Sequence, residues 1–184
     1  PPLICCNGVG VSTFFFKYIV DHFHDRFTVI TWDYRGHGRS STPADPNTAD
    51  LSMERNAKDL AAVYEAAGAQ GPAVLTGHSM GCQVILEFSK QFPERTRALV
   101  PLFGTFSRPL DTFMDSALSK PAFKMIKRVA DAAGKAGTKG LLPIYANPLA
   151  NFVGGATGLM DRHYATKQDI DKYMEHLVHM DPRV

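Results

Sequence analysis

The sequence of 184 residues contains no apolar run that approaches the ~20 residues needed to cross a bilayer. It also lacks a marked excess of either charge, since 20 Lys and Arg stand against 18 Asp and Glu, for a formal net charge of +2. These absences argue against a membrane span, and the scatter of the basic residues argues against a nucleic-acid partner. A hydrophobic fraction of 45% and a charged fraction of 21% are typical of a soluble globular domain.

Cysteine is scarce, with three residues, of which Cys5 and Cys6 are adjacent in an apolar run. Neighbours on a strand point to opposite faces, so no disulfide is expected between them. We interpret these two and Cys82 as small, reduced core residues in a reducing compartment, and expect a cytoplasmic protein. No Cys or His pair at zinc-ligand spacing has a matching second pair, and no G-x-G-x-x-G or G-K-[ST] loop occurs. Neither a metal nor another cofactor is therefore predicted.

The most informative stretch is residues 73–82, where an apolar segment runs into Gly77-His78-Ser79-Met80-Gly81. This pentapeptide fits G-x-S-x-G, and residues 83–92 have a helical pattern. A serine on a sharp turn leaves no room for a β-carbon two residues before or after it, and glycine occupies both positions. Strand, tight turn and helix in that order predict a nucleophile elbow with Ser79 at its tip. The alternative is an ordinary strand-to-helix turn that happens to contain a serine.

Four predicted strands, at residues 3–6, 27–32, 73–76 and 98–103, alternate with helical patterns. Ser12 or Thr13 can cap the first helix, and the second runs over residues 52–67 with Gly68 at its C-terminal cap. Pro93 ends the third helix, whereas Pro101 weakens the prediction of the fourth strand. This alternation predicts an α/β fold, a parallel sheet with helices on both faces.

Beyond Gly104 the sequence has only helical patterns broken by Pro and Gly. They cover residues 110–118, 122–133, 148–160 and 169–179. A helical block of this length that interrupts an α/β sheet is typical of an inserted lid. We therefore assign residues 1–106 to the N-terminal part of the core and residues 107–184 to a helical cap.

Three motifs follow three successive predicted strands: Asn7-Gly8-Val9-Gly10, the segment 33–40 (Asp-Tyr-Arg-Gly-His-Gly-Arg-Ser) and the predicted elbow. In this order and at these spacings, over residues 3–106, the sequence resembles the α/β-hydrolase fold family in its lid-bearing esterase, lipase and lactonase-like branch. The resemblance implies that Ser79 attacks an acyl carbonyl. It also implies that the backbone N–H groups of Val9 and Met80 hold the resulting oxyanion.

The resemblance further assigns Gly8, Gly77 and Gly81 to the shaping of the loop and the elbow. Asn7 departs from the family, which usually has His before the oxyanion glycine, but Asn can still form hydrogen bonds that shape the loop. His78 is interpreted as a packing residue.

Four further polar residues compete for functional roles. We expect Asp33, Arg35 and His37 to tie their loop down with hydrogen bonds rather than to act in chemistry. Cys82 is interpreted as a helix-packing residue rather than a thiol nucleophile.

A serine nucleophile needs a base and a group that orients it, and in this fold the chain order is Ser, acid, His. No predicted strand after Gly104 ends in such an acid or His. The downstream histidines lie in helical or turn patterns and are interpreted as solvated surface residues rather than the base: His163, His176 and His179. Asp161, Asp169 and Asp171 are no better candidates for the orienting acid. We therefore expect the acid and the His beyond Val184, and expect the 184-residue segment to be inactive alone. A sheet ending at residues 98–103 would also expose an apolar edge.

The resulting prediction is a serine hydrolase that acts on a small-molecule ester or lactone through an acyl-enzyme on Ser79. Apolar residues of the predicted lid would suit a hydrophobic acyl or aromatic substrate, although the more ordinary interpretation is that they pack the lid helices together: Phe113, Met114, Leu118, Phe123, Met125 and Ile126. The alternatives are a carbon–carbon bond hydrolase or cofactor-free haloperoxidase on the same fold, or a non-catalytic member that binds a ligand. The sequence determines neither the substrate nor the oligomeric state.

Overall fold

The computed structural model describes residues 1–106, 121, 124–125, 128, 132 and 166–181. Four parallel strands form one sheet in the order β2-β1-β3-β4. They are β1 (Pro2–Cys6), β2 (Thr28–Thr31), β3 (Ala73–His78) and β4 (Thr96–Leu102). The four strands expected from the sequence and their parallel arrangement are thus confirmed.

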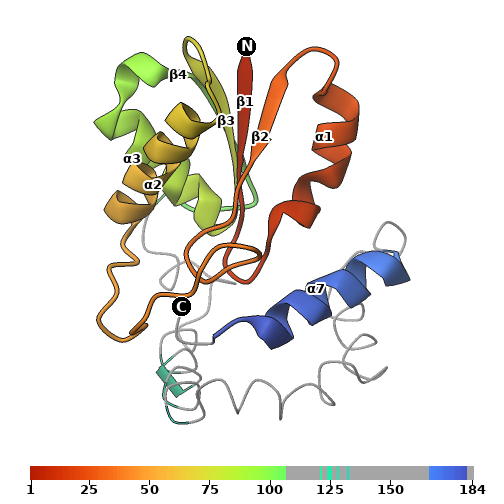
Figure 1. The fold of residues 1–184 in the computed structure, drawn as a ribbon, viewed down its shortest axis with the longest axis vertical. Helices are drawn as coiled ribbons and strands as arrows, with labels where there is room; N and C mark the ends of the chain where they lie inside the picture. The colour runs from red at the N-terminus through yellow and green to blue at the C-terminus, as the bar shows by residue number, and fades with distance from the viewer. Residues whose placement is uncertain (107–120, 122–123, 126–127, 129–131, 133–165, 182–184) are drawn as a thin grey trace.

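Helices cover both faces of this sheet (Figure 1). The 3-10 turn η1 (Thr13–Phe16) and helix α1 (Lys17–Phe23) lie on one face, and α2 (Met53–Ala66) and α3 (Met80–Gln91) lie on the other. Crossovers between parallel strands are right-handed, and the chain moves from β1 to β2 in one direction but returns to β3 in the other. The first helix therefore falls on the opposite face from the next two.

The core lies mainly between the sheet and the pair α2 and α3. Central strand β1 is buried along its whole length, as expected of a parallel strand covered on both faces. The predicted stripe of α2 faces this core, with Ala57, Leu60, Ala61 and Tyr64 buried. Gly68 has a φ of +63° just after the helix, which is the left-handed conformation expected at its C-terminal cap.

The start of the first helical segment differs from the expectation. Neither Ser12 nor Thr13 caps an α-helix. This helical segment begins with the 3-10 turn η1, and the Ser12 side chain makes no capping hydrogen bond. The backbone N–H of Thr13 donates instead to Asp33 Oδ1 at 2.9 Å. A contact with the loop after β2 therefore replaces the local cap.

Strand β4 lies at the end of the sheet and accommodates Pro101, which stands opposite Gly77 in the register. Proline is tolerated on an edge strand because only one side of that strand needs hydrogen-bond donors. Val100 and Phe103 are 42% and 95% exposed, so the described structure has the apolar edge that the sequence analysis anticipated. The 3-10 turn η2 (Pro93–Arg95) leads from α3 into this strand.

Helix α7 (Lys167–His179) confirms the last predicted helical segment and begins with a capping box between Thr166 and Asp169. It lies beyond the carboxyl ends of the strands (Figure 1). The predicted helices at 110–118 and 148–160 lie outside the described residues, and of 122–133 only residues 124, 125, 128 and 132 are described, as helical. The division into a core and a cap at residue 106 stays a prediction.

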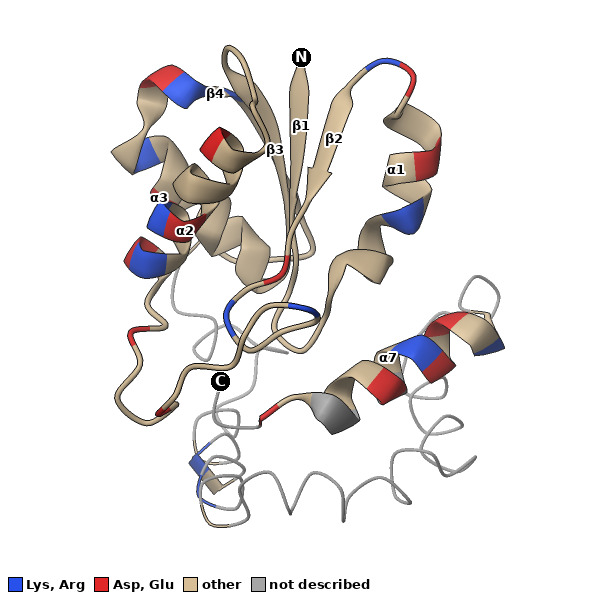
Figure 2. Cartoon of the chain, in the orientation of Figure 1, with Lys and Arg blue, Asp and Glu red and all other residues tan. Residues whose placement is uncertain are grey.

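Charged residues of both signs are mixed along α2, α3 and α7 (Figure 2). Among the described residues, no helix is long and apolar enough to cross a membrane. The same residues contain no group of three or more His, Cys, Asp or Glu that could hold a metal ion.

Candidate active site

The candidate site lies where the strand order reverses. Strands β1 and β3 are neighbours, but the chain leaves β1 toward one edge of the sheet and leaves β3 toward the other. The loops after these strands therefore separate, and in open α/β sheets the space outside such carboxyl ends is the usual ligand site. The loop at residues 7–12 follows β1, and Ser79 follows β3.

Ser79 occupies a strained turn between β3 and α3. Its φ is +52° and its ψ is −116°, a conformation that side-chain-bearing residues rarely adopt. The turn is held by the Ser79 N–H, which donates to the Leu102 carbonyl at 3.0 Å, and by the Ser79 carbonyl, which accepts from the Cys82 N–H at 3.1 Å. Such strain costs about 1–3 kcal/mol and is concentrated at functional sites.

The two glycines of the pentapeptide are required by close backbone packing. A β-carbon at Gly77 would lie 2.8 Å from the Cys82 nitrogen and closer still to the Gly81 carbonyl oxygen. A β-carbon at Gly81 would lie 2.8 Å from the Asn7 carbonyl oxygen and closer still to that of Cys6. The second contact also shows that α3 starts directly against the end of β1.

The loop after β1 passes beside the serine. A β-carbon at Gly8 would lie 3.1 Å from the Ser79 β-carbon and 3.0 Å from His78 Nδ1. Val9, the next residue, is 56% exposed, and Met80 is the first residue of α3. Among the described residues, neither the Val9 N–H nor the Met80 N–H donates to a protein acceptor. Both sequence-predicted donors thus come from segments that adjoin Ser79.

Hydrogen bonds join this loop to the loop after β2. Asn7 is fully buried, its Nδ2 donates to the Trp32 carbonyl at 2.9 Å, and its own carbonyl accepts from the Tyr34 hydroxyl at 2.9 Å. Asn7 therefore shapes the loop through hydrogen bonds, as the sequence suggested. The Gly10 N–H donates to His37 Nε2 at 3.1 Å.

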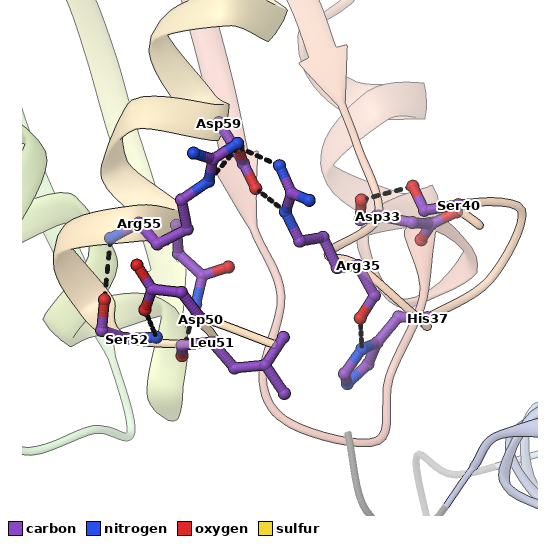
Figure 3. Close-up of polar contacts among 10 residues, drawn as sticks. Asp33, Arg35, His37, Ser40, Asp50, Leu51, Ser52, Arg55 and Asp59 are labelled. Carbon is purple, nitrogen blue, oxygen red and sulfur yellow. Dashed lines mark hydrogen bonds and ion pairs between the residues drawn. The ribbon is translucent and has the colours of Figure 1, made fainter. Parts of the chain in front are cut away.

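Asp33 and Arg35 also tie loops together. One carboxylate oxygen of Asp33 accepts from the Thr13 N–H, and the other accepts from the Arg39 N–H at 3.1 Å. Arg35 forms a bidentate ion pair with Asp59 of α2 at 2.6 and 2.9 Å, which raises the pKa of the guanidinium (Figure 3). These contacts accord with the structural interpretation made for both residues.

His78 packs against an aromatic ring rather than facing solvent freely. Its imidazole stacks on Phe15 with ring centroids 4.3 Å apart, and burial lowers its pKa below the ordinary value. A neutral ring between the glycine loop and Phe15 matches the packing role expected for His78. Nothing in the sequence pattern singled out Phe15, which is 41% exposed beside the candidate site.

The three cysteines are buried and unpaired, as expected. Burial raises the pKa of the Cys5 and Cys6 thiols to about 12 and also raises that of Cys82. The Cys82 thiol donates to the Gly77 carbonyl at 3.0 Å, and a β-carbon at Gly104 would collide with it. Cys82 therefore packs the elbow and has no thiolate character.

Helix α7 lies against the loop after β1. A β-carbon at Gly10 would lie 3.0 Å from Leu177 Cδ2, and the Lys17 side chain forms an ion pair with Asp169. The expectation of a solvated surface residue is wrong for His176, which is partly buried with its ring 6.4 Å from Phe14 and 6.1 Å from His37. The reason is that α7 packs on the core at this turn of the helix.

Two other downstream candidates are described, and both carboxylates pair with residues other than the serine. Asp169 caps α7 and pairs with Lys17, and Asp171 pairs with Lys167 at 2.6 Å. The Ser79 hydroxyl makes no hydrogen bond to a described residue. Asp161, His163 and the His179 side chain lie outside what is described, and the triad acid and base stay unassigned.

A strained serine between a parallel strand and a helix, at the switch point of a β2-β1-β3-β4 sheet, defines the α/β-hydrolase class of fold. The sequence agrees: the family model for the alpha/beta hydrolase fold matches residues 1–176. The chain belongs to the α/β-hydrolase fold family.

Two curated relatives are similar in sequence to parts of the chain. Human (lyso)-N-acylphosphatidylethanolamine lipase is 28% identical over 81% of this chain and 40% of its own length. 3-oxoadipate enol-lactonase 2 of Acinetobacter baylyi is 33% identical over 54% of this chain and 36% of its own length. The matched part of the chain thus spans less than half the length of each of these two curated relatives.

A thermophilic esterase from Thermogutta terrifontis has a similar structure, with a TM-score of 0.68 at 22% identity. The match covers 99% of this chain and 59% of the esterase. At this identity the likeness concerns the fold alone.

Proposed function

We propose that the complete protein is a serine hydrolase that cleaves small-molecule carboxylic esters or lactones through an acyl-enzyme on Ser79. The observation that carries the proposal is the conformation of Ser79, whose φ of +52° is kept at a tightly packed strand-to-helix turn. Strain of this kind persists only where the surrounding packing enforces it. The lipase and lactonase names of two relatives support the ester-type substrate.

In the proposed reaction the Ser79 hydroxyl oxygen bonds to the acyl carbon while its proton passes to a base. The carbonyl oxygen becomes an oxyanion, for which we propose the Val9 and Met80 N–H groups as donors. Met80 stands at the N-terminus of α3, where the helix dipole favours negative charge. Collapse of the intermediate breaks the bond to the leaving alkoxide, which takes the proton, and water then hydrolyses the acyl-enzyme.

The base and its orienting acid are proposed to come from sequence beyond Val184. This part of the proposal rests on the absence of any described partner for the Ser79 hydroxyl and on the chain order of triads in this fold. We also retain the proposal of an apolar acyl or aromatic substrate beneath a helical cap formed by residues 107–184.

Labelling with a fluorophosphonate probe tests the proposal. The complete protein should be labelled and should hydrolyse chromogenic acetyl and butyryl esters, and Ser79→Ala should abolish both activities. Ser89→Ala is the matched control, because Ser89 lies on α3, the helix that follows Ser79, and its hydroxyl only donates to the Leu86 carbonyl at 2.8 Å. Labelling that survives in Ser79→Ala, or a complete protein without turnover, would refute the proposed function.

The 184-residue segment should be tested beside the complete protein. We expect no labelling of the segment, because the hydroxyl alone is a weak nucleophile. Ser79-dependent labelling of the segment would mean that one of its own residues serves as the base.

A further inference from the structure

His37 makes a contact that goes beyond tying its own loop together. Its Nε2 accepts a hydrogen bond from the Gly10 N–H at 3.1 Å, across 27 positions of sequence. Its Nδ1 lies 3.2 Å from the Arg35 carbonyl oxygen (Figure 3). One imidazole thus connects the loop after β2 to the loop that carries Val9.

The Gly10 N–H belongs to the peptide that joins Val9 to Gly10. Holding this peptide restricts rotation about the Val9 backbone, and Gly10 has a φ of +72°, in the left-handed region that glycine adopts readily. On the other side of Val9, Gly8 is packed against Ser79 and His78. The orientation of the Val9 N–H is therefore restricted from two sides, by the packing of Gly8 against the Ser79 and His78 side chains and by the imidazole at Gly10.

The contact requires one protonation state of the ring. A carbonyl at Nδ1 and an N–H at Nε2 are both satisfied only by the neutral imidazole with its proton on Nδ1. Protonation of Nε2 would set a donor against the Gly10 N–H. His37 is 3% exposed, and burial lowers its pKa, opposed by the hydrogen bond to the Arg35 carbonyl and by the charge of Asp33.

Several titratable groups surround this ring. Asp33 and Tyr34 lie on the same loop, the Tyr34 ring centroid being 5.8 Å away, and His176 of α7 faces it at 6.1 Å. Burial raises the pKa of the Tyr34 hydroxyl, which therefore stays neutral. Of Asp33, Tyr34 and His176, Asp33 is the group whose negative charge raises the pKa of His37.

We propose that His37 is a positioning residue, whose neutral imidazole holds the Val9–Gly10 peptide in the orientation needed for the Val9 N–H to meet an oxyanion. The catalytic part of this inference rests on the proposed function. The hydrogen bond and its dependence on the neutral ring stand independently of it, so the two can fail separately.

The first test is made on the complete wild-type protein by NMR. A coupling across the hydrogen bond between the Gly10 amide nitrogen and His37 Nε2 is expected at about pH 8, with the ring proton on Nδ1. The coupling should disappear as the pH falls below about 6.5, through the lowered pKa of His37. A ring protonated at Nε2 at the higher pH, or an assigned Gly10 amide without the coupling, would overturn the proposal whatever the enzyme does.

The second test compares two substitutions of similar polarity. In His37→Gln the amide oxygen reaches the position of Nε2 and can accept the Gly10 N–H, whereas the shorter His37→Asn can replace only the contact of Nδ1 with the Arg35 carbonyl. We expect His37→Asn to lower kcat by about tenfold or more, with KM changed less than about threefold. His37→Gln should stay within about threefold of wild type.

The substitution pair also distinguishes positioning from simple stability. A purely structural role would lower the amount of folded enzyme but leave kcat per labelled Ser79 unchanged in both variants. Equal kcat values for His37→Gln and His37→Asn would overturn the positioning role. If wild type shows no Ser79-dependent turnover, the proposed function fails, and the NMR coupling still decides whether His37 holds the loop.

Discussion

Replacing Gly81 with alanine tests whether the elbow depends on backbone contact between α3 and β1. The added β-carbon would lie 2.8 Å from the Asn7 carbonyl oxygen and closer to that of Cys6, whereas ordinary contacts of this kind begin near 3.4 Å. Both neighbours are backbone atoms, so no side-chain rotation relieves the clash. The start of α3 must move away from the end of β1.

Two opposing effects set the size of the change in unfolding free energy. Overpacking costs about 1–3 kcal/mol, and the rigid neighbours place this case at the upper end of that range. Replacement of glycine by alanine within a helix returns at most about 1 kcal/mol. The clash therefore exceeds the gain in helix propensity, and we expect Gly81→Ala to be destabilised by about 2 kcal/mol.

Gly68→Ala is the matched control. Gly68 has a φ of +63°, but a β-carbon there would meet nothing within 4 Å. The Gly68→Ala substitution therefore costs only conformational free energy, about 1 kcal/mol. Gly81 has no positive φ, so its cost is steric alone. The pair separates the two reasons for which a fold requires glycine.

Urea unfolding of both variants can be followed by the fluorescence of Trp32, the single tryptophan of the sequence, which is 7% exposed. Labelling of Ser79 by the fluorophosphonate probe, carried out with the same substitutions in the complete protein, provides a second measurement. Displacement of the serine by about 1 Å can cost about 100-fold in rate, so Gly81→Ala should lose labelling while Gly68→Ala retains it. A Gly81→Ala protein that is as stable as wild type and normally labelled would refute the steric argument.

Two further predictions concern groups away from the serine. In the native protein, the thiols of Cys5, Cys6 and Cys82 should all resist a reagent such as DTNB, because each thiol is buried and burial raises its pKa. Rapid labelling of any of the three before unfolding would contradict this prediction. The pKa of Asp169 is lowered to about 2, first by its hydrogen bond with Lys17 and then by that with Thr166. Since the folded pKa lies below the ordinary 3.8, the contribution of Asp169 to docking and capping of α7 is complete above about pH 4 and is lost as the pH falls toward 2. Amide exchange in α7 should therefore accelerate across that interval in wild type but not in Asp169→Asn, and identical profiles would count against the ion pair.

The strands, the main helices and the elbow of this protein follow from the sequence, whereas the expected cap at Ser12 or Thr13 does not. Alternating apolar and helical segments predict the parallel sheet, and the glycines on either side of Ser79 predict its strained turn. These predictions succeed because the constraints act over a few residues: strand and helix periodicity, and the space available around a single turn. The elbow is recognisable before any contact is known.

The contacts between loops were decided by tertiary structure. The sequence associated His37 only with its own loop, yet the adjacent, parallel β1 and β2 bring it to Gly10. It likewise treated His176 as a surface residue, although α7 packs this residue near Phe14 and His37. Which loops meet depends on strand order and on how distant segments dock, and periodicity within a segment contains no information about either. The sequence therefore determined the position of the nucleophile candidate, and the fold decided which loops and side chains surround it.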